Sequence, residues 1–265
     1  MSETNKHSEQ IKAKNTSARL SNLIKRASSL TERGSYDKAI ERIQEAMTLS
    51  PRNARCYIQL AKIYKSQNKI APAIEAMQKA VEIDPSNSTV REQLLRTLLE
   101  IGRYDEAISI SCELLKQLPK NVFVRDVLGI IYLQQGELDK ALQVTNELIR
   151  LDPVDPAHHF KKAVLLQQKG QITEAMQAFI RALEMDPEGD MADDAREAIA
   201  ALDGYQLRQI LTIAVEDAVF KTKLILDPDS AARERGFLLS SSGVAALKQI
   251  DLEDLPGDSA NRYYH

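Results

Sequence analysis

The 265-residue chain has no tryptophan, two cysteines and ten glycines, and each shortage argues against a class of protein. With Cys56 and Cys112 alone, neither a disulfide framework nor a cysteine-rich metal site is expected. Few glycines and an aromatic content of 5% give little support for a protein built from strands and tight turns. The composition therefore favours an all-α fold.

Long apolar runs are also missing. No stretch approaches the roughly 20 apolar residues that span a bilayer, and the N-terminal segment lacks the apolar run of a signal peptide. A formal net charge of −3 provides no basic field for binding phosphates. We therefore expect a cytoplasmic protein that binds neither membranes nor nucleic acid.

Catalytic and cofactor motifs are absent too. The sequence contains no GxxxxGK[ST], GxGxxG, HExxH or GxSxG pattern. His158 and His159 are adjacent, so on a helix they point about 100° apart and cannot hold one metal together. We expect His159 to pack and Cys56 to be a buried, inert thiol. The prediction is no enzyme activity, no catalytic residue, no cofactor and no metal.

What the chain does have is a strict period, since a proline and an alanine each recur every 34 residues in five successive units. The prolines are Pro51, Pro85, Pro119, Pro153 and Pro187. The alanines are Ala39, Ala73, Ala107, Ala141 and Ala175. Such a period is typical of a helical solenoid, in which each unit buries its apolar face by stacking on its neighbours.

Alignment on the prolines predicts five units, each with two apolar stripes at helical spacing. These units are 20–53, 54–87, 88–121, 122–155 and 156–189. Between the two predicted helices, one repeat position always holds a residue that accepts the left-handed backbone of a helix end. It is occupied by Gly34, Asn68, Gly102, Gly136 and Gly170. Each unit is therefore expected to be a helix pair, packed closely at its small alanine.

Segments such as RGSYDKAIERIQEAMTLSP, IGRYDEAISISCELLKQLP and KGQITEAMQAFIRALEMDP resemble the tetratricopeptide repeat (TPR) family. The resemblance covers residues 20–189. It implies a right-handed superhelix whose first helices line a concave groove for peptides or partner helices. At the position that the family often fills with tryptophan, this chain has Arg91 and Arg125 in the third and fourth repeats. We expect looser first helices there.

The predicted groove changes character along its length. Its basic part consists of Arg55, Lys62, Lys65 and Arg96. Its later part is apolar except for one acid, and consists of Phe123, Asp126, Ile130, Leu133, Phe160 and Val164. These residues suggest an amphipathic protein or peptide partner whose acidic part meets the cations while its apolar part covers the later repeats. The alternative is that the charges are a solvated face and the apolar residues pack on adjacent helices.

The period ends after Pro187. Residues 190–203 are expected to form a polar capping helix and residues 204–255 a small helical unit, broken at Asp227–Pro228 and Gly236 and restarted at Ser240. At the two ends, residues 1–19 are expected to be a flexible N-terminal segment and the start of the first helix, and residues 256–265 a disordered tail.

The C-terminal unit carries a second resemblance and a charge bias. Its segments DAVFKTKLILDPDSAARERGF and LSSSGVAAL resemble the leader-peptide clan related to the nitrile hydratase alpha subunit, which implies recruitment of a peptide-modifying enzyme. Residues 190–265 carry a net charge of −6 and the preceding residues +3. The chain's own C-terminal unit is therefore also a candidate ligand of the basic half-groove.

Together these features predict a non-catalytic adaptor or scaffold that binds a protein or peptide. Two alternatives stay open. One is an accessory factor of peptide maturation, in which the leader-like unit recruits a modifying enzyme. The other is a noncatalytic subunit of an enzyme complex.

Overall fold

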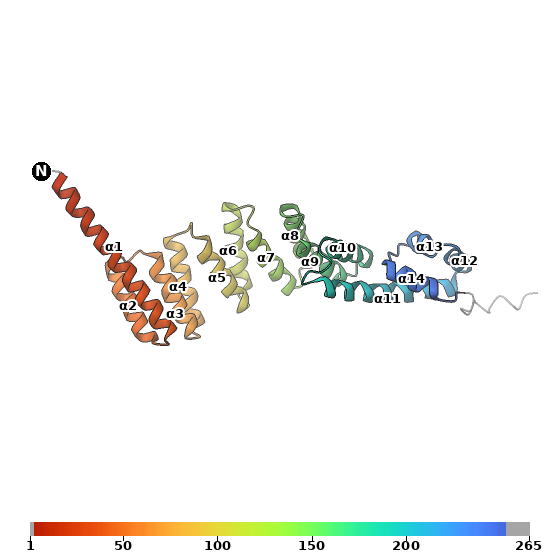
Figure 1. The fold of residues 1–265 in the computed structure, drawn as a ribbon, viewed down its shortest axis with the longest axis horizontal. Helices are drawn as coiled ribbons and strands as arrows, with labels where there is room; N and C mark the ends of the chain where they lie inside the picture. Colours follow the sequence, from red (N-terminus) through yellow and green to blue (C-terminus); the bar gives the residue numbers. More distant parts are fainter. Residues whose placement is uncertain (1–2, 253–265) are drawn as a thin grey trace, which may run out of the picture. The chain divides into compact units, whose positions relative to one another are not determined.

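The structure is a computed structural model that describes the backbone of residues 3–252 and the side chains of residues 14–252. Every regular element in this range is an α-helix, as the composition and the period predict (Figure 1). The chain divides into two compact units, Met1–Pro119 and Lys120–His265, and each is described by itself.

The first unit consists of six helices that pack one after another. They are α1 (Glu3–Glu32), α2 (Tyr36–Leu49), α3 (Ala54–Ser66), α4 (Ile70–Ile83), α5 (Ser88–Glu100) and α6 (Tyr104–Gln117). Leu20, Leu23 and Ala27 of α1 join Ile43 of α2 and Ile63 of α3 in one buried cluster. Within the segment 1–19, which was expected to hold a flexible stretch and the start of the first helix, α1 begins at Glu3, in keeping with a stretch that has neither glycine nor proline.

The second unit begins with two further helix pairs and a long helix. These are α7 (Val122–Gln134), α8 (Leu138–Leu151), α9 (Pro156–Gln168), α10 (Ile172–Met185) and α11 (Ala192–Glu216). Phe179 and Met176 of α10 are buried between α9 and α11, together with Ile199 and Leu202 of α11. The long helix therefore covers the last repeat.

Both ends of the first helices are fixed by residues that recur with the period. Asn53, Asn87, Asn121 and Asp155 each precede a first helix and accept a hydrogen bond from a backbone N–H in its first turn. At the other end, the glycines at the predicted turn position have φ between +73° and +74°, and Asn68 has φ +58°. The prediction of left-handed helix ends is confirmed.

The repeated alanines lie where helices approach closely. Ala39, Ala73, Ala107, Ala141 and Ala175 each have a relative exposure of 0%. A larger side chain at any of them would have to displace a neighbouring helix, because protein interiors are packed as densely as organic crystals.

The two arginines at the tryptophan-like position each bond to the second helix of their repeat, and the looser packing expected of these first helices stays a prediction. Arg91 is buried and donates to Gln117 Oε1 of α6 at 2.9 Å. Arg125 donates through Nε to Glu147 Oε2 of α8, also at 2.9 Å. In both repeats the guanidinium therefore ties the first helix to the second through a directed hydrogen bond, which apolar patterning does not reveal.

Three short helices follow α11: α12 (Ala218–Leu226), α13 (Pro228–Glu234) and α14 (Ser241–Gln249). Their breaks fall at Asp227, at Gly236 with φ +85°, and at the N-cap Ser240, as the sequence indicates. The boundary expected between residues 203 and 204 differs, since α11 runs through it without interruption. The capping helix and the first helix of the C-terminal unit are thus one element.

Polar side chains of α11 hold the segment before α14. The buried carboxylate of Asp203 accepts hydrogen bonds from the backbone N–H and the hydroxyl of Ser240, the former at 2.8 Å. The amide of Gln206 donates to the carbonyl of Leu238 at 2.8 Å and accepts from its N–H at 2.9 Å. These hydrogen bonds tie the continuous α11 to the segment that leads into α14.

Within residues 3–252, no helix combines the length and the apolar character needed to cross a membrane. The tail expected to be disordered, residues 256–265, lies outside the described residues. The predicted division of the chain at residues 189 and 255 stays a prediction.

Candidate functional site

A hollow of about 250 Å³ opens between α7 and α9 of the second unit, and residues of α8 also line it. We call it the α7–α9 groove. Its lining is almost entirely apolar and consists of Asp126, Gly129, Ile130, Leu133, Thr145, Leu148, Phe160, Lys161, Val164 and Leu165. A volume of this size accommodates one or two bulky apolar side chains.

The spacing of residues on α7 sets the length of the groove. Asp126, Ile130 and Leu133 lie at positions i, i+4 and i+7, on one side of two helical turns. Phe160 and Val164 form the opposite wall at i and i+4 on α9. Ile130 remains 42% exposed, and exposed apolar surface costs about 25 cal/mol per Å² relative to burial. The groove therefore favours an apolar occupant.

The groove owes part of its depth to a glycine within a helix. Gly129 lies in the middle of α7, where glycine is less favourable than alanine by about 1 kcal/mol. A Cβ added there would have only Val144 Cγ1 nearby, at 3.9 Å. No close packing within the described residues requires glycine at this position, so its clearest consequence is open space in the groove.

The ring of Phe160 in the groove wall packs against an aromatic ring in the core of the last repeat. It meets the buried ring of Phe179 edge-on, with the centroids 5.4 Å apart and an interplanar angle of 74°. Aromatic pairs favour this arrangement. The groove therefore has one wall anchored in the core of the last repeat.

One ion pair bridges the two walls. Lys161 Nζ of α9 lies 2.6 Å from Asp126 Oδ1 of α7, and the lysine side chain remains 43% exposed. The ammonium group has two further protons and the carboxylate a second oxygen. The rim can therefore offer both donors and acceptors to the backbone of a bound segment.

Five of the six residues predicted for the later part of the groove line this hollow. Asp126, Ile130, Leu133, Phe160 and Val164 all line it, whereas Phe123 does not. Sequence reasoning missed Gly129, Lys161 and Leu165, together with the two residues from α8, Thr145 and Leu148. A signal existed for Lys161, because it lies beside Phe160 on the same helix. No signal existed for the two α8 residues, because the family resemblance assigns the groove to the first helix of each repeat and α8 is a second helix.

The predicted basic residues lie in the first unit, and all four are exposed. Lys65 donates to Thr97 Oγ1 at 3.2 Å and lies 3.8 Å from a carboxylate oxygen of Glu100. Arg55 and Lys62 have no ion-pair partner among residues 14–252. Because the cations and the groove belong to separate units, a single ligand that meets Arg55, Lys62, Lys65, Arg96 and the groove stays a prediction.

The cysteines and histidines offer no assembled catalytic group within residues 14–252. Burial raises the pKa of the Cys56 thiol, as expected of an inert buried cysteine, although Arg55 opposes the shift. His159, which was expected to pack, is half-buried, whereas its neighbour His158 is only 1% exposed. Position 158 is the repeat equivalent of the buried residues Val90 and Val124, which explains its burial.

Comparison with known families identifies the repeats. Residues 30–91 and residues 128–200 each match a family model described as tetratricopeptide repeat, and together the two segments make up just over half of the chain. The chain belongs to the TPR family. The TPR fold predicted from the 34-residue period is thereby confirmed, and the α7–α9 groove lies within the second matched segment apart from its first residue, Asp126.

Solved TPR structures are similar to this chain in fold. MamA from Desulfovibrio magneticus RS-1 has a TM-score of 0.54 at 17% identity, covering 65% of this chain and 97% of that chain. YrrB, described as a TPR protein with an unusual peptide-binding site, has a TM-score of 0.53 at 18% identity, covering 66% and 90%. PilF from Pseudomonas aeruginosa has a TM-score of 0.51 at 20% identity, covering 74% and 93%. At these identities the similarity shows the fold alone.

No curated protein matches the chain. The TPR matches end at residue 200, before the C-terminal helices. The resemblance of residues 205–255 to the nitrile hydratase leader clan, and the recruiting role that it implies, therefore stay predictions.

Proposed function

We propose that this TPR protein is a non-catalytic adaptor that binds an apolar segment of a partner protein in the α7–α9 groove. The observation that carries the proposal is the groove itself, a hollow of about 250 Å³ with apolar walls on two first helices and an exposed Ile130. TPR proteins in general act as scaffolds for other proteins. A cytoplasmic location and the absence of catalysis are part of the proposal on sequence grounds.

The chemistry of the groove restricts the occupant. Apolar walls favour a segment with one or two bulky apolar side chains, because burying them releases water from both surfaces. The Asp126–Lys161 pair at the rim can bond to the backbone of the same segment. A peptide that presents a leucine or an aromatic residue therefore fits better than a highly charged one. Any acidic part of the expected partner would have to pair with the predicted cations of the first unit.

A displayed library of random peptides, selected on the full-length protein, tests this function. We expect the selected peptides to share a bulky apolar residue, and a labelled peptide to bind the wild type with measurable fluorescence polarisation. Ile130→Asp should weaken that binding at least about tenfold, since it places a charge on the apolar wall.

Val154→Asp is the matched control. Val154 is 76% exposed in the same unit but does not line the groove, so this variant should bind the labelled peptide like the wild type. Selected peptides without an apolar residue in common, or equal binding by Ile130→Asp, would refute the proposal.

A further inference from the structure

Helix α12 is apolar on two sides, and only one of them is covered by other residues of the range 14–252. Phe220 and Leu224 are 2% and 0% exposed and belong to the core cluster of the C-terminal helices. On the other side, Val219 is 70% exposed and Leu226 is 80% exposed, with Ile225 beside it at 45%. As far as the structure describes the chain, α12 therefore has an apolar face that no other element covers.

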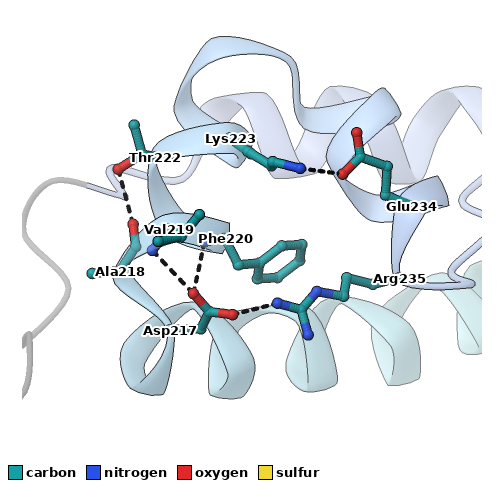
Figure 2. A network of polar contacts seen from close by, with 8 residues as sticks. All are labelled: Asp217, Ala218, Val219, Phe220, Thr222, Lys223, Glu234 and Arg235. Atoms are coloured by element: carbon teal, nitrogen blue, oxygen red, sulfur yellow. Dashed lines mark hydrogen bonds and ion pairs between the residues drawn. The ribbon is translucent and has the colours of Figure 1, made fainter.

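The face is presented by a firmly held helix (Figure 2). Asp217 caps α12 by accepting from the backbone N–H groups of Val219 and Phe220, and it also pairs with Arg235. The Arg235 guanidinium lies 5.1 Å from the centroid of the Phe220 ring. Lys223 of α12 pairs with Glu234 of α13. These contacts tie α12, which carries Val219 and Leu226, to Glu234 and Arg235 at the end of α13.

The exposed face and the α7–α9 groove match in length and in chemistry. Val219 and Leu226 are seven residues apart, which places them on one side of the helix about 10.5 Å from each other along its axis. The groove wall from Asp126 to Leu133 has the same seven-residue spacing on α7. An apolar helix face that enters an apolar groove is an established mode of recognition between proteins.

The charges at the ends of α12 and of the groove favour one orientation of the docked helix. The exposed Asp227 directly follows Leu226 and lies at the negative end of the α12 dipole. Lys161 lies at the end of the groove marked by Asp126, whereas Leu133 and Val164 mark the other end. Docking with Leu226 beside Phe160 and Val219 beside Leu133 brings the negative end of α12 to the exposed ammonium group.

We propose that α12 of one copy of the chain docks in the α7–α9 groove of a second copy. The proposal rests on the proposed function, because it uses the same groove, and it names a partner for it. Each copy contributes one helix face and one groove, so the contact is head to tail and can extend to further copies. External apolar segments then compete with self-association.

Sedimentation velocity of the full-length chain over about two orders of magnitude in concentration tests the proposal. The average mass of the wild type should rise with concentration. Leu226→Asp and Ile130→Asp should each remain monomeric, the first without a functional helix face and the second without a functional groove. Mixed together, the two variants should form a pair of one copy each and nothing larger.

Val154→Asp serves again as the matched control and should self-associate like the wild type, since it touches neither surface. A wild type that stays monomeric, a Leu226→Asp variant that associates like the wild type, or a mixture that does not pair would each overturn the proposal. Circular dichroism should show unchanged helix content in both charged variants, because Leu226 and Ile130 are exposed.

Peptide binding separates this proposal from the proposed function. Leu226→Asp retains the groove and should bind the selected peptide at least as tightly as the wild type. If the wild type is monomeric but binds that peptide, self-association fails and the adaptor function stands. If the wild type self-associates and Ile130→Asp abolishes this while no peptide binds, the groove accepts only its own chain.

Discussion

Lys161 of α9 and Asp126 of α7 form an ion pair of 2.6 Å that links consecutive first helices across the candidate groove. The two residues are 35 positions apart, one more than the repeat, so the pair joins neighbouring faces of successive units. Because both side chains are partly exposed, the pair should contribute less than about 1 kcal/mol to stability.

Lys161→Met should therefore change the thermal midpoint little. If the rim contacts the backbone of a bound segment, the same variant should weaken peptide binding by about tenfold or more, because a hydrogen bond to a charged group contributes about 1.5–3 kcal/mol. Thermal melts and fluorescence polarisation on the same preparation check both effects. A large fall in stability with unchanged binding would show that the pair is only structural.

Two substitutions at Gly129 separate groove volume from helix stability. Gly129→Ala should raise the free energy of unfolding by about 1 kcal/mol, because alanine favours the helix and its Cβ meets only Val144 at 3.9 Å. Gly129→Leu should add a side chain to the hollow and prevent peptide binding. Urea unfolding and polarisation measure the two quantities. A leucine variant that is folded and binds normally would contradict the role of the hollow.

Replacing His158 should stabilise the second unit. The ring is 1% exposed, neither nitrogen has a hydrogen-bond partner, and Nε2 lies 3.5 Å from Asp155 Oδ2. An unsatisfied buried polar group costs about 1–3 kcal/mol. His158→Val, the residue found at the equivalent position of the preceding repeats, should raise stability by roughly 1 kcal/mol after the loss of packed volume. Val124→His should lower it, and urea unfolding of both variants provides the comparison.

The neighbouring His159 should make stability depend on pH. Burial, with help from the cations Arg181 and Lys162, lowers its pKa in the folded state. The unfolded chain therefore binds the proton more readily, and the contribution of His159 is present above its ordinary pKa and lost as the pH falls below it. Thermal melts at pH 7.5 and 5.5 should show a smaller decrease for His159→Gln than for the wild type. An equal decrease would assign the effect to other groups.

Asp203 should be needed for the C-terminal helices. Its buried carboxylate accepts from the N–H and the hydroxyl of Ser240, so Asp203→Ala leaves a buried donor without a partner at a cost of about 2–3 kcal/mol. The rate of amide hydrogen exchange should increase in α14, and it should increase less in α8. Asp193→Ala is the matched control, since that side chain is 96% exposed, and it should leave exchange in α14 unchanged.

Much of the fold can be read from the sequence because the period imposes it. The prolines, the alanines and the glycines at one turn position specify helix lengths and ends locally, and the structure has them at the predicted places. Asn53, Asn87, Asn121 and Asp155 form a fourth periodic set that the same reasoning could have used. Local signals of this kind need no knowledge of the neighbouring helices.

The parts that were missed depend on side-chain geometry between helices. The sequence shows that Ile130 and Phe160 face the same way, but not that Gly129 and residues of α8 leave a hollow between them. Apolar patterning equally could not show that Arg125 bonds to Glu147, or that Asp203 and Gln206 of the continuous α11 bond to the segment before α14. These arrangements follow from contacts over 20 to 40 residues, which no local pattern encodes.

Methyl nuclear magnetic resonance of the full-length chain during titration with a selected peptide tests the central claim most directly. We predict chemical-shift changes concentrated on the methyl groups of Ile130, Leu133 and Val164, with small changes elsewhere, and their loss in Gly129→Leu. Changes centred on the other helices, with these three residues unaffected, would contradict the assignment of the α7–α9 groove as the binding site.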